Sequence, residues 1–389
     1  MTHDEAALAH VLDGAHRASA AELPGLIEDG ARRLGLTRAV MYLADLQQIT
    51  LVPLLAPDAS PDDPVDIESS LGGLAYRTQQ VQRARDGAVA WVPMIDGIER
   101  IGVMKVTAPV LTPPLLERAT ALASLATLIV LTKAAHDDVI VRQERTRPMT
   151  IQAELLWAFL PPRTIGTRDV TSAAVLEPAY AIGGDAFDHN FGDGVLHQAL
   201  LDAMGHDLAS GGASAAALAA YRATRRAGGS LGDIAVTIDR TLSRWIPGRL
   251  MTAVLVRFDP ARGVLSWVNC GHPPPLLIRD KHVLPSALQR PADLPLGFGF
   301  HAESPPAEHH ARLQPRDRVL FYSDGVTEAR STAGEQFGEQ RLADTIIRTM
   351  AAGDTAPEAL RRLIQRLRSH KDHRLNDDAT ILLTEWHPA

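Results

Sequence analysis

The stretch from Leu313 to Arg330 reads LQPRDRVLFYSDGVTEAR and contains the clearest transition from strand to turn in the chain. Arg318 to Ser323 is a mostly apolar run, and Asp324 and Gly325 follow it directly. A short apolar run that ends in Asp-Gly is typical of a buried β-strand followed by a turn. This strand therefore brings the carboxylate of Asp324 to the edge of a packed sheet.

Other acidic positions also stand next to predicted strands. They are Asp185, predicted just past a strand; Asp202, at the end of the strand predicted at 195–201; and the pair Asp377 and Asp378, immediately before the last strand, 379–386. Any one of these aspartates is more often part of a turn than a ligand. Side chains at strand ends are held rigidly, however, and several can converge on one edge of a sheet.

Converging carboxylates repel one another and raise one another's pKa values, and a divalent cation removes that repulsion. Hard oxygen ligands suit Mg²⁺ or Mn²⁺ rather than Zn²⁺. Two such ions about 3.5–4 Å apart can acidify a water molecule and clamp a phosphate. The single cysteine, Cys270, excludes a four-cysteine zinc site, a Cys-x-x-Cys redox motif and an internal disulfide.

The N-terminal third has a different pattern. Helical spacing of apolar residues covers 5–36, and two strand pairs follow at 38–56 and 88–107, the second around Asp96-Gly97, a hairpin signal. A helix is predicted at 115–132. The chain has 389 residues, which indicates two or three domains. We expect an α+β protein with a first domain at 1–137, a linker helix at 138–164 and a second domain at 165–389.

Charge and composition restrict the partners. The chain carries 39 Lys and Arg against 46 Asp and Glu, a net charge of −7, which argues against nucleic acid. The longest charge-free run, 263–278, is interrupted by prolines and is too short to span a bilayer. The N-terminus, MTHDE, lacks the features of a secretory signal. These patterns predict a cytoplasmic protein with no membrane segment.

The acidic residues fall within a series of motifs that resembles a known family. The motifs are AIGGDAFD (181–188), DAMGHD (202–207), NCGHPPPLL (269–277), LPLG (294–297), LQPRDRVLFYSDGVTEAR (313–330), FGEQRL (337–342) and NDDATILL (376–383). In this order, they resemble the metal-dependent PPM-type (protein phosphatase 2C-like) serine/threonine phosphatases, in the branch of sporulation stage II protein E. The resemblance implies a β-sandwich flanked by helices, with a metal site at one edge.

The resemblance also implies roles for single residues. Asp185 would bridge two Mn²⁺ or Mg²⁺ ions, and Ala186 would offer its backbone carbonyl. Asp324 and Asp377 would ligate the second ion, and Asp202 would bind a further ion or its waters. Asp378 remains an alternative to its neighbour Asp377. Asp185, Asp324 and Asp377 are thus the expected catalytic residues, acting through a metal-activated water that attacks phosphoserine or phosphothreonine.

Two positions depart from the family's usual pattern. Ala186 stands where an aromatic residue is common, and Asp207 stands where the second motif usually has glycine. A backbone carbonyl is supplied equally well by alanine. Asp207 is expected to cap the helix that follows it, because aspartate is a favoured N-cap residue. Neither change removes an expected metal ligand.

The first domain resembles a GAF domain through VPMIDGIERIGVMKVTA (92–108) and the helix after it. This implies an α/β/α module that binds a small molecule or forms a homodimer. The resemblance of the C-terminal part further implies that the substrate is a phosphorylated regulatory protein, such as an anti-sigma-factor antagonist. Two alternatives stay open: a non-catalytic binding protein that retains the fold, and a phosphatase of small phosphate esters.

One further motif is assigned a structural role. Gly228 to Gly232 reads GGSLG and matches the G-x-S-x-G pattern of hydrolase nucleophiles. That pattern requires a preceding strand, whereas a helix is predicted here. We therefore expect Ser230 and Asp233 to cap the next helix.

Overall fold

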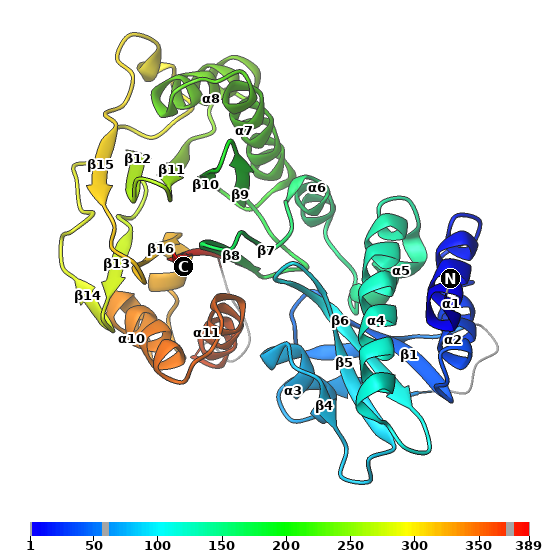
Figure 1. The fold of residues 1–389 in the computed structure, drawn as a ribbon. Coiled ribbons are helices and arrows are strands. Elements are labelled where there is room, and N and C mark those ends of the chain that lie inside the picture. The colour runs from blue at the N-terminus through cyan, green and yellow to red at the C-terminus, as the bar shows by residue number, and fades with distance from the viewer. Residues whose placement is uncertain (1, 57–61, 371–376, 389) are drawn as a thin grey trace. The chain divides into compact units, whose positions relative to one another are not determined.

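The computed structural model describes residues 2–56, 62–370 and 377–388. The chain divides into two compact units, Met1–Pro148 and Met149–Ala389, which we call the N-terminal and the C-terminal unit. Figure 1 labels the elements of both. The segment 138–164, expected to be a linker, is divided between them. Ile140 is buried in the core of the first unit, and Ala153 and Leu156 are buried in the core of the second.

The N-terminal unit is a six-stranded antiparallel sheet with helices on both faces. Its strand order is β3-β2-β1-β6-β5-β4. In chain order the elements are α1 (His3–Ala15), α2 (Leu23–Arg33), β1 (Arg38–Ala44), β2 (Thr50–Leu54), β3 (Val65–Asp66), α3 (Leu71–Thr78), β4 (Gln82–Arg83), β5 (Val89–Asp96), β6 (Glu99–Thr107), α4 (Pro113–Ala134) and α5 (Asp138–Glu144). The predicted strand pairs and the long helix are therefore confirmed.

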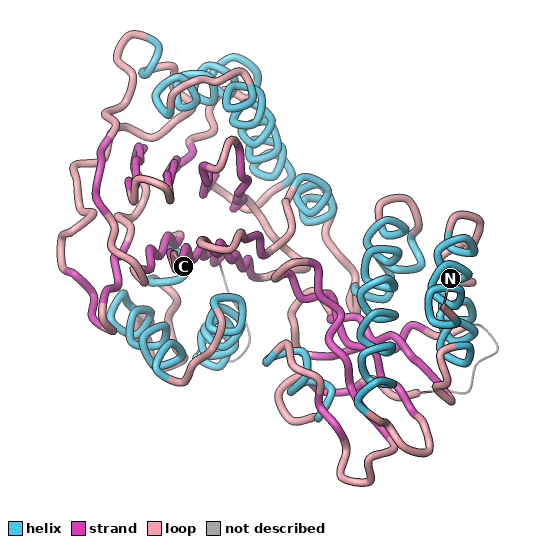
Figure 2. Tube along the Cα trace, in the orientation of Figure 1, coloured by secondary structure: helices cyan, strands magenta, loops and turns pink. Residues whose placement is uncertain are grey.

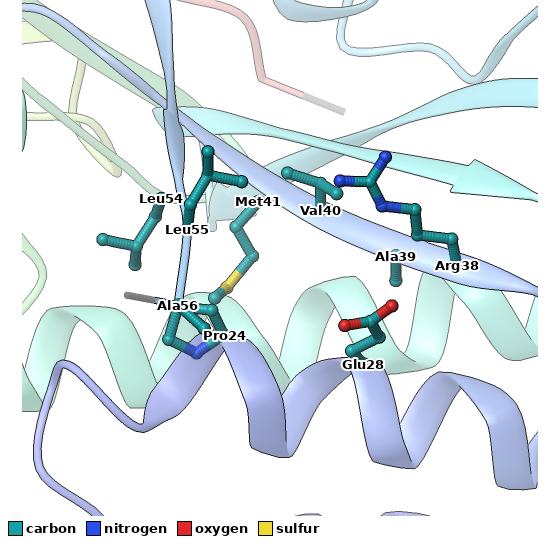
Figure 3. Close-up of a pocket in the computed structure, with 9 residues that line it drawn as sticks. All are labelled: Pro24, Glu28, Arg38, Ala39, Val40, Met41, Leu54, Leu55 and Ala56. Carbon is teal, nitrogen blue, oxygen red and sulfur yellow. The ribbon is translucent and has the colours of Figure 1, made fainter. Parts of the chain in front are cut away.

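Alternation along the strands gives this sheet two apolar faces. Met41 and Leu43 of β1 belong to the core formed with α1, α2, α4 and α5. Val40 and Tyr42 point to the other face, where α3 adds Tyr76. A pocket lies between α2 and the strands β1 and β2, with the charged side chains of Glu28 and Arg38 on its lining (Figure 3).

Helix α4 is long and apolar enough, by length and composition alone, to cross a membrane. Its residues Leu122, Ala126 and Val130 are nevertheless buried in the core of the N-terminal unit. An apolar helix buried on one face is what a folded domain of this size requires, because its sheet must be covered. The composition of α4 is therefore accounted for by packing.

The C-terminal unit consists of two stacked sheets between helices (Figure 2). The sheet orders are β15-β12-β11-β10-β9 and β14-β13-β16-β17-β8-β7. The elements are α6 (Ile151–Phe159), β7 (Thr164–Gly166), β8 (Val170–Glu177), β9 (Asp185–Gly192), β10 (Val195–Ala203), α7 (Leu208–Arg226), α8 (Leu231–Trp245), β11 (Met251–Asp259), β12 (Val264–Cys270), β13 (Leu276–Arg279), β14 (His282–Leu284), η1 (Phe300–Ala302), β15 (His309–Arg312), β16 (Arg318–Tyr322), α9 (Asp324–Thr327), α10 (Gly338–Ala351), α11 (Ala356–His370) and β17 (Ala379–Trp386).

Strand β16 shows how the layers are built. Val319 and Phe321 face the core shared by the two sheets, while Leu320 and Tyr322 face α10 and α11. A strand buried on both sides needs apolar residues at successive positions, which explains the continuous run seen in the sequence. Helices α7 and α8 cover the outer face of the other sheet (Figure 1). The predicted sandwich flanked by helices matches this arrangement.

Some elements differ from the sequence-based expectations. His309 and His310 begin the edge strand β15, which pairs with β12 and is not among the strands that the sequence patterns predict. The short strands β7 and β14 and the helix α10 carry patterns too short or too mixed to be found by periodicity. Their backbone is ordered by neighbours that are distant in sequence, as in the pairing of β7 with β8.

A buried chain of polar side chains crosses from one sheet of the C-terminal unit to the other. The Thr384 hydroxyl donates to Gln198 Oε1 at 2.9 Å, and Gln198 Nε2 donates to Ser172 Oγ at 2.9 Å. Ser172 Oγ lies 2.8 Å from His189 Nδ1, and His189 Nε2 lies 2.6 Å from the Pro162 carbonyl. Because that carbonyl only accepts, Nε2 carries the proton and Nδ1 accepts from Ser172. The network is satisfied with a neutral imidazole.

Because His189 is buried as a neutral ring, we expect the free energy of unfolding to depend on pH. Burial lowers the pKa of His189 from 6.5 to about 4. The neutral ring therefore contributes stability that is complete above pH 6.5 and is lost as the pH falls toward 4. We expect the free energy of unfolding of the wild type, relative to His189→Gln, to fall by about 2 kcal/mol between pH 7.5 and pH 5. Urea unfolding at both pH values measures this, and a pH-independent difference would contradict it.

Candidate metal centre

Asp185 and Asp202 lie opposite each other on neighbouring antiparallel strands. Asp185 is the first residue of β9, and its register partner on β10 is Asp202. The expectation that Asp185 follows a strand was wrong, because it begins one. The two carboxylates still meet, since the start of one antiparallel strand lies beside the end of its neighbour. Ala186, the next residue on β9, pairs with Leu201 and is fully buried.

The two strands of the other sheet bring Asp324 and Asp377 to the same edge. Asp324 begins α9 directly after β16, and Asp377 precedes β17, the neighbour of β16. The Ser323 N–H donates to the Thr380 carbonyl at 3.0 Å, and the Thr380 N–H donates to Ser323 Oγ at 3.0 Å. Gly325 is required here, because a Cβ at that position would collide with the Asp378 carbonyl. Asn376, the first residue of the NDDATILL motif that contains Asp377, lies outside the described residues.

Asp378 has a role different from that of Asp377. Its Oδ2 accepts the backbone N–H groups of Gly183, Gly184 and Asp185 at 2.8, 2.7 and 3.0 Å. Asp378 is buried, whereas Asp377 is exposed. The carboxylate of Asp378 therefore ties the start of β17 to the loop before β9. The structure leaves Asp377 as the member of the pair whose side chain faces solvent.

The loop before β9 also lacks room for side chains. A Cβ on Gly184 would collide with the Ala203 carbonyl, and one on Gly183 would lie 2.5 Å from the Cα of His206. The Ser214 hydroxyl of α7 donates to the Gly184 carbonyl. Because glycine has no side chain, Gly183 and Gly184 let the loop before β9 lie close to the end of β10 and to α7.

Electrostatics at this edge are those of crowded carboxylates. Burial raises the pKa of Asp185 well above its ordinary value, and the charges of Asp202 and Asp378 add to the rise. Burial, followed by the charges of Asp324, Asp377 and Asp378, raises the pKa of Asp202 to about 7. Burial and the nearby Asp377 also raise the pKa of Asp324. The charged state of this cluster is therefore costly in the protein alone.

The donor set fits a hard divalent cation. Asp185 Oδ2 is buried and has no hydrogen-bond partner, which leaves an oxygen ligand unsatisfied. All four side chains that converge here offer carboxylate oxygens, the ligand type preferred by Mg²⁺ and Mn²⁺. Within the three described ranges, no group of three His, Cys, Asp or Glu side chains is arranged to enclose an ion as it stands. The residues present therefore fit the ion in chemistry and position, with coordination requiring side-chain adjustment.

Helix α6 is attached to the segment that leads into the site. The Trp157 Nε1–H donates to the Ala179 carbonyl at 2.8 Å, and the Thr150 N–H donates to the Tyr180 carbonyl at 3.0 Å. At the other end of the helix, Arg222 of α7 donates to the Phe159 carbonyl and to Asp188 Oδ2 of β9. Helix α6 is thus hydrogen-bonded to the backbone before the Gly183–Asp185 loop and is linked through Arg222 to the Asp188 carboxylate after it.

Three other sequence interpretations can be compared with the structure. Asp207 is the N-cap of α7 and accepts from the Ser210 N–H, so the capping role is confirmed. Ser230 and Asp233 form a capping box at the start of α8, which confirms that Ser230 has a structural role. Cys270 is free and buried.

Sequence reasoning did not find the side-chain contacts that support the Asp202 end of β10. His272 Nδ1 lies 2.8 Å from Thr252 Oγ1, and Thr252 is the register partner of Asp202. Arg249 Nη2 donates to Asp207 Oδ2 at 2.6 Å and Nη1 donates to the Met204 carbonyl at 3.2 Å. Neither contact has a signal in local sequence, because the partners are 20 to 45 residues apart.

Residues 192–387 match the family described as stage II sporulation protein E (SpoIIE). This chain belongs to the SpoIIE family. The matched range includes Asp202, Asp324, Asp377 and Asp378 and begins after Asp185 and Ala186. The C-terminal unit is accordingly a SpoIIE-type domain, as the motifs indicated.

A curated relative is Protein IcfG of Synechocystis, 33% identical over 128 residues, which are 32% of this chain and 19% of the relative. The chain thus spans about a fifth of the length of that relative.

The chain is also similar to several solved structures. The RsbU and RsbW domains of a Mycobacterium tuberculosis protein are 25% identical, with 57% of this chain and 62% of that chain covered and a TM-score of 0.48. The SiaA-PP2C domain of Pseudomonas aeruginosa is 20% identical, with coverages of 55% and 85% and a TM-score of 0.47. The catalytic domain of PstP, described in complex with two manganese ions, is 19% identical, with coverages of 57% and 99% and a TM-score of 0.40.

Proposed function

We propose that this protein is a metal-dependent protein serine/threonine phosphatase. The observation that carries the proposal is the meeting of Asp185, Asp202, Asp324 and Asp377 at one edge of a SpoIIE-type sandwich, with a buried, unpartnered oxygen on Asp185. Mn²⁺ or Mg²⁺ held there would supply an acidified water and positive charge for a phosphate.

The chain's own residues prepare this edge. Asp378 fixes the backbone of Gly183–Asp185, so that the buried Asp185 carboxylate is held in one place. Ala186 would contribute its backbone carbonyl to the ions, as the family resemblance implies. The remaining carboxylates, at the ends of β10, β16 and the start of β17, approach from two sheets and leave the site open to solvent at Asp324 and Asp377.

We further propose that the substrate is a phosphorylated regulatory protein of the anti-sigma-factor antagonist type, and that the N-terminal unit regulates the activity as a GAF-like module. The attachment of α6 to the loop that leads into the site supports regulation, because α6 follows directly after the N-terminal unit. A comparison of turnover by the full chain and by residues 149–389 measures the regulation, and identical rates would refute it.

Hydrolysis of p-nitrophenyl phosphate and of phosphothreonine peptides by the full chain tests the catalytic proposal. We expect turnover of both substrates with Mn²⁺ or Mg²⁺ and none after treatment with a chelator, since only the cations offset the carboxylate charges. If neither substrate is turned over, the non-catalytic binding protein is favoured. Turnover of the ester but of no phosphopeptide or phosphoprotein would favour a small-molecule phosphatase.

A further inference from the structure

Large apolar side chains gather on the surface next to the candidate metal centre. Six of the eight exposed large apolar side chains that the structure describes in the C-terminal unit belong to three neighbouring segments. We call these six residues the apolar rim: Met204, Leu208, Trp245, Leu294, Phe298 and Phe300, each more than half exposed. Exposed apolar residues that cluster in this way mark interaction surfaces far more often than isolated ones do.

Arg249 holds two of the three segments together. Its side chain donates to the Met204 carbonyl at 3.2 Å and to the Asp207 carboxylate at 2.6 Å. On the other side, its backbone carbonyl is so close to Gly297 that a Cβ there would collide with it. The loop that carries Met204 and Leu208 and the loop that carries Leu294, Phe298 and Phe300 therefore flank the same short segment.

The second loop is rigid. The fully buried carboxylate of Asp239 on α8 accepts the N–H groups of Gly297, Gly299 and His301 at 2.7, 2.9 and 3.0 Å. The rings of Phe298 and Phe300 lie 5.4 Å apart between centroids. A buried charge satisfied by three backbone donors fixes the loop, so these two aromatic residues are presented to solvent in a defined arrangement.

The third segment is the C-terminal turn of α8. A Cβ on Gly299 would lie 3.6 Å from the Ser243 hydroxyl, which places this turn against the same loop. Trp245, 70% exposed, ends the helix, and the Arg244 guanidinium lies 4.9 Å from its ring centroid. Figure 1 shows the segment with η1 beside α8.

The apolar rim is continuous with the carboxylate edge. Met204 is two residues beyond Asp202, and Leu296 forms a β-bridge with Met251, next to Thr252, the register partner of Asp202. A phosphate that reaches the carboxylates on a protein side chain brings its flanking residues over this rim. A polar or small substrate gains nothing from exposed aromatic residues, whereas an apolar segment gains about 25 cal/mol for each Å² buried.

We propose that the apolar rim is the docking surface for the phosphoprotein substrate and that it selects phosphoserine or phosphothreonine flanked by apolar side chains. The inference rests on the proposed phosphatase function and specifies its substrate class. Because the loop is preorganised, little conformational entropy is lost on binding, and the two phenylalanines act as the anchors.

Two phosphothreonine peptides that differ only in their flanking residues, leucine and phenylalanine in one and serine in the other, test the proposal. With Mn²⁺ and the full chain, we expect kcat/KM to favour the apolar peptide by about 10-fold or more. In the double variant Phe298→Ser/Phe300→Ser this preference should fall to about 2-fold or less, when each rate is divided by that for p-nitrophenyl phosphate in the same preparation. Leu128→Ser, an exposed leucine of α4, is the matched control and should keep the preference.

Binding of the same peptides to chelator-treated protein, followed by fluorescence anisotropy, separates docking from catalysis. If the apolar peptide binds more tightly than the serine peptide and the double variant loses this difference, the apolar rim is supported, whether or not a substrate is hydrolysed. Absence of hydrolysis would then reject only the proposed function. Equal binding and equal kcat/KM of both peptides would overturn the inference. It would also be overturned if the double variant turned a dimer into a monomer without changing peptide binding, because a second copy would then be the occupant.

Discussion

Asp185→Asn is expected to abolish phosphate hydrolysis while making the metal-free protein more stable. The substitution removes a charged oxygen ligand, and loss of a comparable electrostatic group costs about 100- to 1000-fold in rate. Burial and the charges of Asp202 and Asp378 raise the pKa of Asp185, so its charged form destabilises the fold above the ordinary aspartate pKa. A neutral amide removes that repulsion, and the melting temperature in chelator should rise.

The measurements are turnover of p-nitrophenyl phosphate and thermal unfolding, each with Mn²⁺ and with a chelator. The wild type should gain stability when Mn²⁺ is added, and the variant should gain little. Asp193→Asn, at an exposed turn where asparagine tolerates the positive φ of 50°, is the matched control and should behave like the wild type. A variant that retains both turnover and the Mn²⁺-induced stabilisation would exclude Asp185 as a ligand.

Asp378→Ala should be the most destabilising aspartate substitution at the site. It leaves the N–H groups of Gly183, Gly184 and Asp185 without their acceptor in a buried loop. Unsatisfied buried donors cost about 1–3 kcal/mol each, and partial access of water reduces the sum, so we expect a loss of about 3–5 kcal/mol in the free energy of unfolding. Urea unfolding in the presence of chelator measures this loss without the contribution of bound metal.

Asp377→Ala is the matched comparison, because the two residues are adjacent and identical in type. Asp377 is exposed, and its side chain accepts only the Asp378 N–H, at 3.0 Å, among the hydrogen bonds that the structure describes. Its loss should cost less than about 1 kcal/mol of stability but should abolish metal-dependent turnover. The reverse pattern, with Asp377 essential for folding and Asp378 for metal binding alone, would mean that the assignment of the pair is exchanged.

The sequence located most elements because their patterns are local. The apolar run of β16 and the Asp96-Gly97 turn between β5 and β6 are specified by residues within a few positions of each other. It did not place β9, because this strand begins at Asp185 directly after two glycines and continues through the mixed sequence DAFDHNFG. Pairing with β10 orders this strand, and that contact is not visible in local periodicity.

The sequence by itself determined the family, the acidic residues of the site and the exclusion of cysteine-based metal chemistry. These follow from residue types and their order along the chain. Only the tertiary structure separated Asp377 from Asp378, joined Arg249 to the two loops of the apolar rim and fixed one of those loops through Asp239. Each of these depends on hydrogen bonds between residues 42 to 195 positions apart. Such contacts form only after two sheets and their helices have packed, so adjacent and chemically identical side chains acquire different roles from their surroundings.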